Sequence, residues 1–139
     1  MDAAELERKL TLLRAAWAFF DGVAARVSPE LRKGPRGGGR DRDKIIGHVI
    51  RVESMDFAQG VGIAVPDGNT LIPDGIPGYR EAYVAAMRDY NDGKVTRMRS
   101  RTLPFLIRHS AFHTLDHAWE MEDKDLSAAA NAGEGSRTI

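Results

Sequence analysis

Apolar residues recur at helical spacing in four stretches of this chain, and polar or glycine-rich segments separate the stretches. A repeat every three or four residues is the period of one helix face. The first stretch, residues 3–27, ends at Ser28-Pro29. Its apolar face is formed by Leu6, Leu10, Leu13, Trp17 and Phe20. The pattern therefore predicts a long amphipathic helix with one buried face.

The same pattern predicts helices over residues 41–59, 78–91 and 102–124. Asp41 and Thr102 stand where N-caps are expected, and Pro104 lies in a first turn, where proline is tolerated. No stretch alternates as a strand would. We therefore expect an all-α fold, a four-helix bundle over residues 1–125. Residues 126–139 are small and polar, and they predict a flexible C-terminal tail.

The connection between the second and third predicted helices decides the expected topology. It covers residues 60–77 and is rich in glycine and proline. A helix of ~19 residues is about 28 Å long, and a connection of this size can run back along that whole length. Long crossovers permit parallel neighbours. We therefore expect an up-down-down-up bundle with a long crossover between helices 2 and 3.

Composition narrows the possible functions. The 139 residues carry 20 basic and 20 acidic side chains and no cysteine. The zero net charge gives no reason to expect nucleic-acid or membrane partners, and no apolar run approaches the ~20 residues of a membrane span. We expect a soluble, cytoplasmic protein with a small-molecule substrate. Any metal must be held by imidazole and carboxylate groups.

Three of the four histidines, His109, His113 and His117, are spaced four residues apart, so they share one helix face. The residues between them are largely apolar, which predicts that this helix is buried. A buried polar stripe is costly unless its nitrogens are bonded, and a metal ion satisfies this need. His48 is expected to face inward from the start of the second helix. In the expected topology it lies level with His113 and His117.

These histidines stand in two elements that resemble the DinB-like (DinB/YfiT-like) superfamily of helical-bundle metalloenzymes. The first is Gly47-His48-Val49-Ile50-Arg51-Val52-Glu53, and the second is residues 112–123. Residues 34–45 are similar to an actinobacterial-type branch. The resemblance implies an up-down-down-up bundle and a metal site of His48, His113 and His117. His109 matches no ligand position of the family and is interpreted as a cleft or packing residue.

The resemblance also implies a chemistry. Characterised relatives include metal-dependent transferases and isomerases in which a divalent ion, here Zn²⁺ or Ni²⁺, binds a low-molecular-weight thiol. Three protein ligands leave one position open for such a ligand. Relatives often dimerise, so a homodimer is possible. The chain departs from better-known members after His117, where it has Ala-Trp-Glu instead of His-x-Gly-Gln. This departure leaves open a non-catalytic small-molecule-binding or interaction module.

Two further groups are candidates for the site. Glu120, three residues after His117, either orients a ligand imidazole or acts as a general base; a solvated glutamate is the alternative. Asp116 is a weaker candidate of the same kind. The glycine-rich segment 32–44 has six basic and two acidic residues and leads into a helix N-terminus, a position that can bind an anion. Its substrate-binding candidates are Arg36, Arg40 and Arg42. The alternative is a solvated connector. Trp17 and Trp119 are interpreted as core residues.

Overall fold

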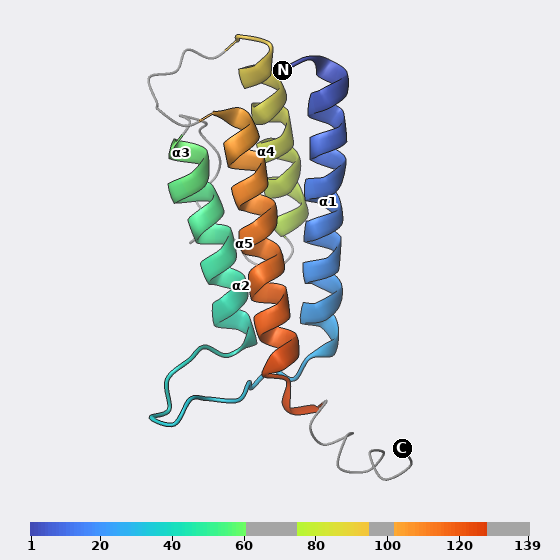
Figure 1. Cartoon of the computed structure of the whole chain (residues 1–139). Helices are drawn as coiled ribbons and strands as arrows, with labels where there is room; N and C mark the ends of the chain where they lie inside the picture. The colour runs from blue at the N-terminus through green and yellow to red at the C-terminus, as the bar shows by residue number, and fades with distance from the viewer. Residues whose placement is uncertain (61–74, 95–101, 128–139) are drawn as a thin grey trace.

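The fold is known from a computed structural model, which describes residues 1–60, 75–94 and 102–127 (Figure 1). Within these residues the structure is helical, and its one isolated β-bridge joins Leu31 to Asp125. The elements are α1 (Ala3–Arg26), α2 (Arg42–Arg51), the π-helix η1 (Val52–Phe57), α3 (Ala58–Gly60), α4 (Ile76–Asn91) and α5 (Leu103–Asp123). Because α2, η1 and α3 follow one another without a break, they form one continuous helix. The predicted all-α four-helix bundle is confirmed.

The direction of the helices also agrees with the prediction. In Figure 1, α1 and α5 run side by side in the same direction, whereas α2 and α4 run in the opposite direction. This order is up-down-down-up. The predicted crossover falls mainly on residues 61–74, which lie outside the described residues. The start of α2 and the end of α5 lie at the same end of the bundle, which we call the lower end as drawn in Figure 1.

Side-chain caps hold two of the helix starts. The Asp2 side chain accepts a hydrogen bond from the Glu5 N–H at 2.8 Å. Thr102 accepts from the Phe105 N–H at 3.3 Å, as its N-cap position predicted. Asp41 also occupies an N-cap position, but its side chain makes no capping bond to α2. Instead it accepts from the Leu31 N–H and from Lys33, and so ties the preceding loop to the helix start.

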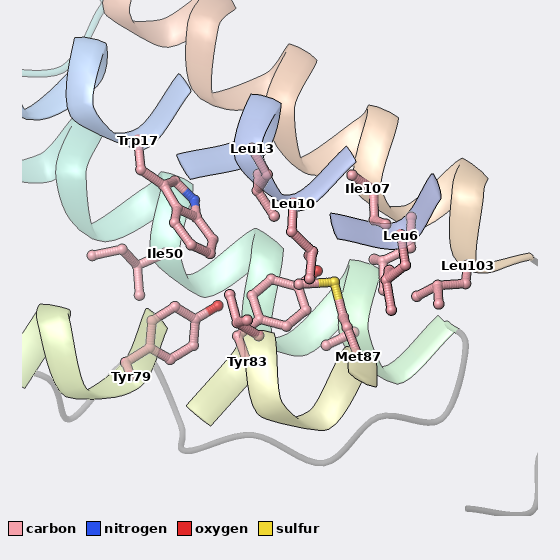
Figure 2. Packing of buried hydrophobic residues seen from close by; sticks show 13 residues of the cluster. Leu6, Leu10, Leu13, Trp17, Ile50, Tyr79, Tyr83, Met87, Leu103 and Ile107 are labelled. Atoms are coloured by element: carbon pink, nitrogen blue, oxygen red, sulfur yellow. The ribbon is translucent and has the colours of Figure 1, made fainter. Parts of the chain in front are cut away.

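The core consists of two packed groups of buried side chains. The larger one fills the middle and upper part of the bundle between all the helices, and Trp17, Tyr79 and Tyr83 are its bulkiest members (Figure 2). The predicted core position of Trp17 is thereby confirmed. The smaller group, which includes Phe20, Ile45 and Met121, packs α1, α2 and α5 together near the lower end.

The prediction that the α5 segment around its histidines is buried is wrong for Phe112 and Trp119. Phe112 is 65% exposed and Trp119 is 51% exposed. A helix in a four-helix bundle buries one stripe, and on α5 that stripe contains Ser110, Thr114 and Ala118. At 100° per residue, Phe112 and Trp119 lie on the opposite side of the helix. The apolar content of this segment therefore supplies an outer face as well as a core face.

A carboxylate is buried in the middle of this core. Glu53, in the π-helix, is 3% exposed. It accepts hydrogen bonds from the Trp17 Nε1–H at 3.1 Å and from the Tyr79 hydroxyl at 2.8 Å. Burial is the main reason that its pKa rises to about 7, although both hydrogen bonds act in the opposite direction. The core of this bundle therefore contains a group that titrates near neutral pH.

The chain beyond α5 returns to the loop that precedes α2. Asp125 accepts from the Ser28 N–H at 2.9 Å, and the Leu126 N–H donates to the Ser28 hydroxyl at 3.1 Å. These bonds fasten Asp125 and Leu126 to the segment after α1. Of the predicted flexible tail, residues 128–139 lie outside the described residues.

Candidate metal centre

The lower half of the bundle brings three histidines together from two helices. His48 comes from α2, and His113 and His117 come from consecutive turns of α5. Their ring centroids are 5.2 Å apart for His48–His113, 4.8 Å for His48–His117 and 4.5 Å for His113–His117. One nitrogen of each ring lies within 4.8 Å of the others. The structure thus assembles the three predicted ligands into one half-buried group, here called the histidine cluster.

The spacing of the donor atoms suits a small divalent ion. The Nε2 atoms of His113 and His117 are 3.1 Å apart. Two nitrogens bound to one tetrahedral ion at ~2.05 Å are separated by about 3.3 Å. One nitrogen of His48 completes the group, and the three donor nitrogens all lie within 4.8 Å of one another. Among the described residues, Nδ1 of His113 is buried without a hydrogen-bond partner. The donor set and its spacing therefore fit Zn²⁺ or a similar ion.

Glu120 fixes the orientation of one imidazole in this cluster. Its Oε1 lies 2.7 Å from Nδ1 of His117, and its Oε2 accepts from Lys124 Nζ at 2.9 Å. A proton on Nδ1 leaves the lone pair of Nε2 directed at His113. A carboxylate that holds the outer nitrogen in this way sets the tautomer of a metal-binding histidine. Since both oxygens of Glu120 are engaged, this geometry favours orientation of His117 over the abstraction of a proton from substrate.

The surroundings of His48 and His113 favour their neutral imidazoles, the form that binds metal. Burial, together with the nearby His117 and His48, lowers the pKa of His113 to about 4. Burial and the positive charge of Arg40 likewise lower the pKa of His48. The Glu120 carboxyl is partly buried, which by itself raises its pKa. The hydrogen bonds from Lys124 and His117 outweigh that effect and keep its pKa below the usual range.

His109 and Asp116, the other two candidates on α5, lie outside the histidine cluster. The ring of His109 stacks on Phe105 with their centroids 3.9 Å apart, and Phe57 packs against its edge at 5.8 Å. This position agrees with its interpretation as a packing residue. Asp116 is exposed. It acts on the cluster through its charge, which opposes the lowering of the pKa of His113.

The three arginines predicted to bind substrate lie on or beside the loop at the lower end. Arg40 is close enough to act electrostatically on His48 and His113. Arg42 donates from Nε to Asp43 at 3.0 Å, and Arg36 is exposed on the loop. Their role in substrate binding stays a prediction.

Sequence reasoning missed a cavity beside this loop. It has a volume of about 610 Å³, and its charged lining consists of Arg32, Lys33 and Lys124. Lys124 was placed at the end of the last helix, and its contact with the loop was not foreseen. The signal in the sequence was its spacing of four residues from Glu120, which puts the two on one helix face. The tertiary structure was needed to bring it to residues 32–39.

Comparison with known proteins adds no relative. The chain matches no protein-family model, and neither a curated protein nor a solved structure is significantly similar to it. Among the helices of the described ranges, none combines the length and apolarity needed to cross a membrane. The features that bear on function are therefore the histidine cluster and its surroundings.

Proposed function

We propose that this protein is a metal-binding helical bundle, and that it acts as a metal-dependent transferase or isomerase on a small-molecule substrate. The observation that carries the proposal is the convergence of His48, His113 and His117, with two Nε2 atoms 3.1 Å apart. The resemblance of both histidine elements to the DinB-like superfamily supports it. That resemblance also suggests a low-molecular-weight thiol as the second cofactor.

In this proposal the three imidazoles would hold Zn²⁺ or Ni²⁺. Such an ion would act as a Lewis acid and lower the pKa of a thiol or water bound to it. The chain's own residues provide the surroundings. Glu120 keeps the Nε2 lone pair of His117 directed into the cluster. Phe57 packs against the edge of His113 with their centroids 5.5 Å apart and thereby covers one side of the site with an apolar ring.

A second candidate is a non-catalytic module in which the same site binds a small molecule without turnover. The engagement of Glu120 favours it, because both carboxylate oxygens already have partners in His117 and Lys124. Both candidates require the metal site. They differ in whether a bound thiol is consumed or released unchanged.

The first test is the metal content of the purified, tag-free protein by inductively coupled plasma mass spectrometry. We expect about one Zn or Ni per chain in the wild type. His48→Ala and His113→Ala are expected to lose the metal, since each removes one of three ligands. His109→Ala is the matched control: it removes an imidazole one turn before His113 that stacks on Phe105, and it should keep the metal.

The proposal would be refuted if His113→Ala still bound metal tightly. It would also be refuted if the wild type contained no metal after reconstitution with Zn²⁺ and Ni²⁺. If the metal content follows the expected pattern, a screen of thiols and electrophiles separates the two candidates. Product formation that needs both metal and thiol identifies the enzyme. Saturable thiol binding without product identifies the binding module.

A further inference from the structure

The cavity at the lower end of the bundle is lined by cations and backbone. Its lining residues are Arg32, Lys33, Gly34, Pro35, Gly38, Gly39 and Lys124. Its volume of about 610 Å³ is within the range of small-molecule sites. Gly39 adopts a φ of +122°, and a β-carbon built on it would lie 3.8 Å from the Lys33 side chain and 4.0 Å from Lys124 Nζ. The glycine-rich loop therefore lies close to the side chains of Lys33 and Lys124.

The charges around this cavity favour an anion. Each of its charged lining residues is a cation, and each cation has a carboxylate partner: Arg32 pairs with Asp123, Lys33 with Asp41 and Lys124 with Glu120. These pairs hold the cations in place and balance their charges, so the excess of positive charge comes from the rest of the loop. Residues 32–44 carry six basic and two acidic side chains, a net charge of +4. The Gly34 N–H already donates to the Gly38 carbonyl at 2.8 Å, so the backbone donors for an anion are those of Gly38 and Gly39. Because the site combines these donors with positive charge, it suits an oxyanion rather than an apolar ligand.

The cavity is linked to the histidine cluster through two side chains. Lys124 lines the cavity and donates to Glu120 Oε2, while Oε1 of the same carboxylate contacts Nδ1 of His117. One carboxyl group and one imidazole ring thus separate the cavity from the candidate metal position. An anion in the cavity would compete with Glu120 for Lys124 and so act on the hydrogen bond that orients His117.

We propose that this cavity binds the anionic end, a carboxylate or a phosphate, of the small molecule whose other end reaches the histidine cluster. The statement about the other end rests on the proposed metal function, whereas anion binding in the cavity stands independently of it. Arg32 and Lys33 are the recognition residues. Lys124 is a positioning residue, because it connects the occupied cavity with Glu120.

The test is a titration of the ¹⁵N-labelled, metal-free protein with glutarate and, separately, with inorganic phosphate at matched ionic strength, followed by nuclear magnetic resonance. We expect saturable shifts of the Gly34, Gly38 and Gly39 amides with at least one of the two anions. The anion that binds more tightly identifies the recognised group. The His117 ring signals should move along the same binding curve, a response that a purely local surface contact would not give.

Two variants and a control show whether the lining cations are responsible. The Arg32 side chain is 61% exposed, so Arg32→Gln alone should not affect folding. It should raise the Kd for the anion several-fold. Arg32→Gln combined with Lys33→Gln should raise it at least tenfold. Arg26→Gln is the control: it neutralises an arginine at the same end of the bundle that pairs with Glu122 and does not line the cavity. Its Kd should stay within twofold of the wild type.

Glycine amides that do not shift with either anion, or a Kd that Arg32→Gln and Arg26→Gln change equally, would overturn the proposal. The same titration with His113→Ala separates it from the metal function. Anion binding should persist in that variant, because His113 does not line the cavity. A metal site that fails its own test thus leaves the result for the cavity intact, and the reverse also holds.

Discussion

The buried carboxyl group of Glu53 makes the stability of this bundle depend on pH in a defined direction. We consider the substitution Glu53→Gln, which removes the titration and keeps the shape. The amide oxygen of glutamine can accept from the Trp17 Nε1–H, and its NH₂ group can donate to the Tyr79 oxygen. At acidic pH, where Glu53 is itself neutral, the variant and the wild type should have the same free energy of unfolding within about 1 kcal/mol.

The size of the effect follows from the pKa of the group in the two states. Burial raises the pKa of Glu53 in the folded protein from its ordinary 4.5 to about 7. Between these values the folded state binds more protons than the unfolded state, so stability falls as the pH rises. Each unit corresponds to 1.36 kcal/mol, so the wild type loses roughly 3 kcal/mol between about pH 4.5 and pH 7. Above about pH 7 the loss is complete.

The variant isolates this effect from an opposing one. Burial lowers the pKa of His113 to about 4, so its contribution to stability is present above pH 6.5 and is lost as the pH falls toward 4. Both proteins share that contribution. It therefore cancels in the difference between their free energies of unfolding, and the difference curve reports Glu53.

The assay is urea denaturation of both proteins, followed by circular dichroism at a series of pH values from about 4 to about 8.5. We expect Glu53→Gln to become the more stable protein as the pH rises, with an advantage that levels off near roughly 3 kcal/mol. A difference curve that is flat across this range would refute the reasoning, because the carboxyl would then have the same pKa in both states. A curve of opposite sign would show that its hydrogen bonds outweigh its burial.

Two further substitutions test separate parts of the structure. Glu120→Gln is expected to weaken metal affinity by about 10- to 100-fold while the stoichiometry stays at one, because His117 loses the carboxylate that orients it. Competition with a chromogenic chelator measures the affinity. An unchanged affinity would contradict the role of Glu120 in orienting His117. Leu13→Ala removes most of a fully buried side chain from the larger core group. It should lower the free energy of unfolding, measured by urea denaturation, by about 2–5 kcal/mol. The metal content of Leu13→Ala should not change, because Leu13 lies on α1, which supplies none of the three histidines. A loss of metal would show that the packing around Leu13 and the histidine cluster are coupled.

The histidine cluster was predictable because it depends on helical periodicity and one topological choice. His113 and His117 share a face of α5 for any helix of that length. Their meeting with His48 required the antiparallel packing of α2 and α5, which the long connection before α4 indicated. The exposed positions of Phe112 and Trp119 were not predictable, since a count of apolar residues does not show which side of a helix faces a partner.

The sequence by itself therefore determined the helices, the bundle and the three histidines, because each depends on contacts a few residues apart or on connection length. The tertiary structure decided what depends on distant neighbours. It gave Glu53 a buried site between Trp17 and Tyr79, and it placed Lys124 against the loop of residues 32–39. The pKa of a carboxyl group and the charge of a cavity are set by whatever lies within a few ångströms in space. That is the physical reason why folding had to be known before either could be stated.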